Sequence, residues 1–132
     1  MPDCIPYRKP NEDIPGQCTA AVTGKRFLSV SGTRTSGPGL SNTAEGSNYR
    51  VAHTGAGLRS IGVSMWDAPI NGKIGIIRGG IVPVTAGAAI TAGQEVQSDA
   101  TGQAAPLTTG KSLGVAMADA ALGADCEVSL LV

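Results

Sequence analysis

Four side chains in this sequence could bind a metal ion or take part in catalysis. They are the only histidine, His53, and the three cysteines, Cys4, Cys18 and Cys126. Together they would fill a four-coordinate zinc site, but no two of them show the close spacing that zinc ligands usually have. His53 could serve as a general base, yet no nucleophile elbow or other supporting motif accompanies it. The sequence therefore predicts no metal site, no cofactor and no catalytic residue, and a protein that is not an enzyme.

The glycine-rich segments also lack the residues of known ligand-binding motifs. Gly37–Gly46 has no Lys-Ser or Lys-Thr ending and is not a phosphate-binding loop. Gly55–Gly57 has no strand-to-helix setting, which a dinucleotide site requires. Lys73 follows Asn71-Gly72, as the modified lysine of a biotinyl or lipoyl domain would follow a tight turn, but it lacks the flanking methionine or acidic residue. A domain of the biotinyl or lipoyl type is therefore disfavoured.

Short strands separated by turn residues account for most of the chain. Residues 60–65 alternate small polar with apolar side chains, and Asn71-Gly72 is a strong hairpin signal. Residues 115–122 favour a helix, but they are too few, so we predict a strand and then a turn. The pattern predicts an all-β fold with no helix beyond about ten residues. The predicted strands are Arg26–Ser31, Asn48–His53, Arg59–Trp66, Lys73–Arg78, Ile81–Val84, Glu95–Ser98, Gln103–Ala105, Ser112–Ala118 and Asp125–Val132.

The N-terminal segment is predicted to be an extended arm. Its prolines recur every four or five residues, so neither a helix nor a central strand is expected there. We place the arm at residues 1–18 and a single β-domain at residues 19–132. Apolar side chains in the arm, Ile5, Tyr7 and Ile14, could lie along a neighbouring protein. The alternative is a frayed terminus.

Composition limits the classes of partner. The chain has 10 basic and 10 acidic residues among 132, so it lacks the basic surface of a general nucleic-acid binder. No stretch approaches the roughly 18 apolar residues of a membrane span. The odd number of cysteines and the absence of an apolar leader predict synthesis in a reducing cytoplasm. Only 15% of residues are charged, against about 25% in ordinary soluble domains, which favours an oligomer or a docked protein.

The long segment Ser31–Asn48 is rich in Gly, Ser, Thr and Asn and is predicted to be a surface loop. Such a loop could belong to a host-surface or carbohydrate-binding module, which is the main alternative function. Aromatic residues usually serve sugar binding, and here they make up only 3% of the chain.

Two segments of the C-terminal half carry a family resemblance. Val82–Pro106 and Gly110–Leu131 resemble the small decoration, or cement, proteins of tailed-phage capsids, which share similar valine-rich strands and glycine turns. Cys4–Gly32 is similar to actinobacteriophage head proteins of this kind. Thr33–Ser47 has no counterpart there.

The resemblance implies a small β-barrel or β-sandwich that assembles as a homotrimer. It implies a virion protein on the outer surface of an icosahedral head, made in the host cytoplasm, that stabilises contacts between major capsid subunits. In such families a terminal arm commonly reaches over the capsid. The candidate capsid-contact residues are therefore Ile5, Tyr7, Arg8, Lys9 and Ile14.

Overall fold

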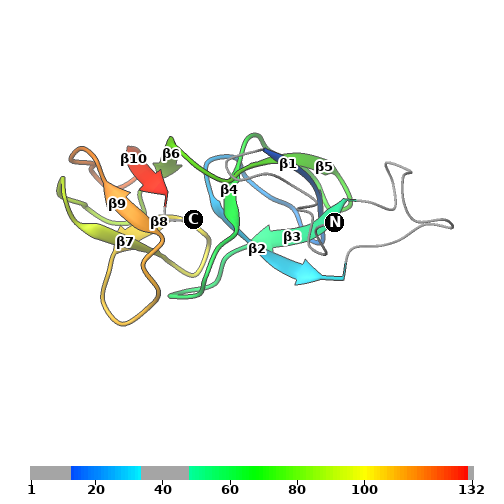
Figure 1. The fold of residues 1–132 in the computed structure, drawn as a ribbon, viewed down its shortest axis with the longest axis horizontal. Coiled ribbons are helices and arrows are strands. Elements are labelled where there is room, and N and C mark those ends of the chain that lie inside the picture. Colours follow the sequence, from blue (N-terminus) through cyan, green and yellow to red (C-terminus); the bar gives the residue numbers. More distant parts are fainter. Residues whose placement is uncertain (1–12, 34–47, 131–132) are drawn as a thin grey trace, which may run out of the picture.

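The computed structural model describes residues 13–33 and 48–130, and within these ranges the chain consists of strands and turns. A closed barrel of five strands, in the order β1-β3-β2-β4-β5, is followed by a five-stranded sheet, in the order β6-β10-β9-β7-β8 (Figure 1). The predicted all-β fold is confirmed. No helix of the described ranges could cross a membrane. The strands are β1 (Ile14–Cys18), β2 (Phe27–Gly32), β3 (Tyr49–His53), β4 (Gly62–Ser64), β5 (Lys73–Ile77), β6 (Ile81–Thr85), β7 (Glu95–Ser98), β8 (Ala104–Pro106), β9 (Gly114–Ala116) and β10 (Asp125–Leu130).

The barrel closes through β1, which pairs in parallel with β3 and antiparallel with β5. Its interior is too narrow for a side chain at every inward position. A Cβ atom on Gly16 would lie 2.8 Å from Cδ1 of Ile76 and 3.3 Å from Cγ2 of Val51. The barrel core is formed by eight buried residues: Ile14, Cys18, Val22, Leu28, Val51, Ala68, Ile74 and Ile76.

The expectation that the proline-spaced segment contains no central strand is wrong for Ile14–Cys18, which form β1 and pair on both sides. Pro15 is tolerated because it lies at the start of the strand. It stands opposite Gly75 of β5, whereas pairing with β3 begins only at Gly16. Pro15 has no backbone N–H to donate, but this breaks no hydrogen bond between β1 and β3. Residues 1–12, the rest of the predicted arm, lie outside the described residues.

The second sheet is built around two similar turn units, residues 86–96 and 116–126. They meet at an isolated bridge between Ile90 and Ala120, where each backbone N–H donates to the other's carbonyl at 2.9 Å. Each unit turns at a glycine with positive φ, Gly93 (88°) in the first and Gly123 (84°) in the second. The sheet therefore has an internal pseudo-twofold arrangement, and the helix-favouring residues 115–122 form a strand end and a turn.

The barrel and the sheet share an apolar core. Phe27 and Val63 belong to barrel strands, yet both pack in the cluster that fills the sheet side. Backbone hydrogen bonds also cross the junction, including Phe27 N–H to the Gly102 carbonyl (2.8 Å) and Thr85 N–H to the Lys25 carbonyl (3.0 Å). The barrel and the sheet are therefore two lobes of the molecule, and these contacts fix the position of one lobe against the other.

Most predicted strands form, but the segment around Asn71-Gly72 differs from the expected hairpin. Asn71 has φ 66°, and Gly72 N–H donates to the Pro69 carbonyl at 2.8 Å, so these residues make a turn at the end of a longer connection. The preceding strand is also shorter than predicted, since β4 spans only Gly62–Ser64, and in the connection after it Ala68 forms an isolated bridge with Val22.

Candidate functional site

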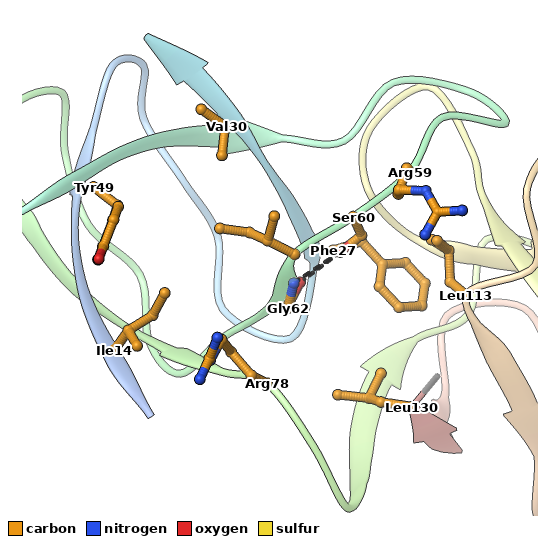
Figure 2. A pocket seen from close by; sticks show the side chains of 11 residues that line it. Ile14, Phe27, Val30, Tyr49, Arg59, Ser60, Gly62, Arg78, Leu113 and Leu130 are labelled. Atoms are coloured by element: carbon orange, nitrogen blue, oxygen red, sulfur yellow. Dashed lines mark hydrogen bonds between the residues drawn. The ribbon is translucent and has the colours of Figure 1, made fainter. Parts of the chain in front are cut away.

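A groove of about 460 Å³ lies at the junction of the barrel and the sheet (Figure 2). Its lining comes from both lobes and from residues far apart in the sequence. The lining residues are Ile14, Phe27, Val30, Tyr49, Arg59, Ser60, Ile61, Gly62, Arg78, Leu113 and Leu130.

The floor of the groove is apolar. Three apolar side chains form the end of the floor that is nearest the sheet, and Figure 2 shows them gathered together. Phe27 begins the barrel strand β2, Leu113 precedes β9 and Leu130 ends β10. Phe27 and Leu113 are buried, whereas Leu130 is half-buried. A partner that covered this floor would gain the free energy of removing apolar surface from water.

The charged side chains of the lining are both arginines, Arg59 and Arg78. Among residues 13–33 and 48–130, no acidic residue lines the groove, although the chain as a whole has equal numbers of basic and acidic residues. The groove therefore combines an apolar floor with positive charge, which is suited to a ligand that is apolar and anionic at once.

The backbone beside Arg59 is held firmly. The Ser60 hydroxyl accepts the Gly62 N–H at 3.0 Å and lies 3.0 Å from the Leu28 carbonyl oxygen, to which it can donate. Gly62 fits here because a Cβ atom at this position would lie 2.5 Å from the carbonyl oxygen of Ile77. The segment that carries Arg59 is therefore fixed against β2 and β5, and the groove wall is pre-formed.

A second exposed apolar surface lies on the outside of the barrel, where residues 65–72 connect β4 to β5. Trp66, the only tryptophan of the chain, is 50% exposed, and its indole N–H donates to the Lys73 carbonyl at 3.1 Å. Met65 and Ile70 are exposed as well. The Trp66 indole is therefore an ordered aromatic group at the surface, of the type that often anchors protein interfaces.

The structure places one of the five candidate contact residues predicted from the sequence. Ile14 is only 6% exposed and packs in the barrel core while lining the groove, so it does not fit the predicted role of an exposed contact on an arm. The other four, Ile5, Tyr7, Arg8 and Lys9, lie outside the described residues.

Sequence reasoning missed the groove. Arg59 and Arg78 stand alone at the ends of predicted strands, and Leu113 lies 35 positions beyond Arg78 in the chain. No local spacing connects them, because it is the packing of the sheet on the barrel that brings them together.

The side chains considered for chemistry serve structural roles where the structure describes them. Nε2 of His53 accepts the Thr23 N–H at 3.0 Å. Burial and the nearby Arg26 lower the pKa of His53, whereas Asp99 acts in the opposite direction. Cys18 and Cys126 are buried free thiols, and burial raises the pKa of both. Residues 13–33 and 48–130 contain no cluster of three potential metal ligands.

Comparison with known structures supports this fold. The chain is similar to the crystal structure of the head fiber gp8.5 N base in bacteriophage phi29, with a TM-score of 0.71 and 16% sequence identity. The alignment covers 91% of this chain and 93% of the phage phi29 chain. At this identity the likeness establishes a shared fold. No curated protein sequence matches this chain.

Comparison with protein families gives a match to the phage cement proteins over residues 10–131. The match spans the whole barrel and the whole second sheet, including both turn units and every residue that lines the groove. The chain therefore belongs to the phage cement protein family, a family of structural proteins of the phage capsid.

Proposed function

We propose that this protein decorates the outer surface of an icosahedral phage head and stabilises the contacts between major capsid subunits. The observation that carries the proposal is the family match over residues 10–131. The two exposed apolar surfaces, the groove and the region around Trp66, add support because a cement protein must cover apolar area on its partner.

The proposal is tested with purified heads that lack the protein. Adding the protein should give saturable co-sedimentation with heads and should raise the temperature at which the heads release DNA. A protein that binds intact heads but not disrupted ones stabilises the intact heads by mass action, so the shift should grow with protein concentration. Absence of co-sedimentation at micromolar protein would contradict the proposal.

The N-terminal arm is proposed as the main anchor. Ile5 and Tyr7 can supply apolar contact, and Arg8 and Lys9 can pair with carboxylates on the capsid. Chain segments rich in proline lose less conformational entropy when they become ordered, which favours binding. Deleting residues 2–12, and not beyond, removes these four side chains while keeping Ile14 in the barrel core.

The deletion should weaken binding to undecorated heads by at least about tenfold, the scale of losing one buried aromatic anchor. Co-sedimentation at limiting protein measures the loss. Equal occupancy for the deletion variant and the intact protein would show that the arm is not the anchor, while leaving the decorating function in place.

A further inference from the structure

We propose that the groove between the barrel and the sheet is the docking site for an extended segment of the major capsid subunit that carries an apolar side chain next to a carboxylate. The proposal rests on the proposed function and assigns a site and a partner chemistry to it. Three features of the groove support this proposal: its apolar floor, its positive charge and the open edge of β2.

The apolar floor sets the first requirement on the partner. Phe27 and Leu113 are buried in the core shared by the two lobes, so the floor is rigid and its shape does not depend on the partner. The volume of about 460 Å³ falls within the range of about 300–1,000 Å³ that is typical of ligand sites. It is large enough to receive one or two large side chains of an inserted segment.

The charge sets the second requirement. Arg59 is exposed, and no hydrogen bond or ion pair of its guanidinium is seen within residues 13–33 and 48–130. Arg59 therefore adds a positive charge to the lining, and a carboxylate on the partner would form a charge-assisted hydrogen bond with it. Within the chain's own N-terminal arm, the segment around Tyr7 is a poorer match, because Tyr7 is followed directly by the cations Arg8 and Lys9.

The open edge of β2 sets the third requirement, an extended backbone. β2 pairs with β4 only at Phe27 and Leu28, but it continues along β3 as far as Gly32. Within the described part of the chain, no strand covers the β4-facing edge of residues 30–32. Val30, which lines the groove, is 59% exposed there. A peptide can add to such an edge as a strand while its side chains enter the neighbouring pocket.

The first experiment locates the partner segment. A photo-crosslinking benzoylphenylalanine replaces Val30 in the groove, or Leu122, which is 72% exposed and does not line the groove. Each variant is bound to purified heads and irradiated, and crosslinked peptides are identified by mass spectrometry. Position 30 should crosslink to one capsid segment that contains both an acidic and a large apolar residue, and position 122 should not crosslink to that segment.

The second experiment tests the charge. Arg59→Glu should weaken binding to heads about tenfold or more, since reversing a charge turns attraction into repulsion. Lys111→Glu is the matched control, because Lys111 is exposed and does not line the groove, and it should change affinity less than twofold. Both variants should melt like the wild type, so a loss of binding is not a loss of folding.

The outcomes separate the two proposals. If the wild type binds heads but Arg59→Glu binds equally well, or position 30 crosslinks to no capsid segment, the groove is not the docking site and the decorating function still stands. If position 30 crosslinks only to another copy of this chain, the groove belongs to a contact between copies and the inference is overturned. If the wild type fails to bind heads, the proposed function fails first.

Discussion

At the scale of single residues, the backbones of Gly57 and Gly110 approach each other closely. A Cβ atom on Gly110 would lie 2.4 Å from Cα of Gly57 and 2.9 Å from its carbonyl oxygen. Both obstacles are backbone atoms that cannot rotate away. Gly110→Ala should therefore destabilise the protein by about 1–3 kcal/mol, which urea denaturation measures.

A matched glycine variant controls for the general effect of alanine. A Cβ atom on Gly32 would lie 3.5 Å from Cβ of Arg50, an ordinary contact, and its φ is not positive. Gly32→Ala should change the free energy of unfolding by less than about 0.5 kcal/mol. Equal stabilities for the two variants would contradict the argument from close approach.

His53 should make the stability of the protein depend on pH. Burial and Arg26 hold the pKa of His53 below its usual value of about 6.5, and an Nε2 that accepts the Thr23 N–H carries no proton. Below about pH 6.5, His53 therefore binds a proton in the unfolded chain but stays neutral in the folded chain. The contribution of His53 is complete above about pH 6.5 and is lost as the pH falls towards the lowered pKa.

Urea denaturation of the wild type and of His53→Gln between pH 7.5 and 5 measures this contribution. The wild type should lose more free energy of unfolding than the variant over that interval, because glutamine can accept a hydrogen bond but does not titrate. Parallel curves for the two proteins would show that His53 has the same pKa in both states.

At the scale of elements, β1 determines whether the barrel closes. It pairs with β3 on one side and β5 on the other, and it contributes Ile14 and Cys18 to the core. Deleting residues 2–18 should therefore unfold the barrel, because the loss of two strand pairings and two buried side chains is comparable to the total stability of a small domain, about 5–15 kcal/mol.

Deleting residues 2–12 is the control, since it leaves β1 in place and should give a Tm close to that of the intact protein. Circular dichroism and thermal melting distinguish the two deletions. A cooperative melt of the longer deletion, at the Tm of the shorter one, would show that β1 is dispensable for the fold.

At the scale of the whole molecule, the resemblance to capsid decoration proteins predicts a homotrimer, whereas composition alone predicts only an oligomer or a docked protein. The core consists mostly of small aliphatic side chains, while eight large apolar side chains are exposed among the described residues, and few charges separate them. Association would bury some of that surface. The exposed apolar residues are Val30, Leu58, Met65, Trp66, Ile70, Ile81, Met117 and Leu122.

Sedimentation equilibrium at micromolar concentration should give a mass three times the 13.2 kDa of one chain. A mass of 13.2 kDa would contradict a trimer that forms in solution. A trimer that forms only on the head would then be tested by crosslinking on decorated heads.

Most of the strands can be predicted from the sequence, because alternation of apolar and polar side chains is a local property. In β10, Cys126 and Val128 are buried while Asp125 and Glu127 are exposed, as the spacing predicted. The all-β fold was predicted for the same reason. The expectation that prolines exclude a central strand was wrong for β1. It depends only on local sequence, and the local sequence does not show that β3 pairs with β1 only from Gly16 onwards.

The division of the strands into a barrel and a sheet, and the position of the groove, could not be predicted from the sequence because they depend on long-range packing. Strand pairing joins residues far apart, such as Ile14 with Ile76, and the sequence pattern does not specify which apolar strand meets which. Arg59, Arg78 and Leu113 come from three separate segments and meet only because the lobes share a core around Phe27. Side-chain periodicity therefore fixes which face of each strand is buried, whereas long-range packing fixes which side chains share a site.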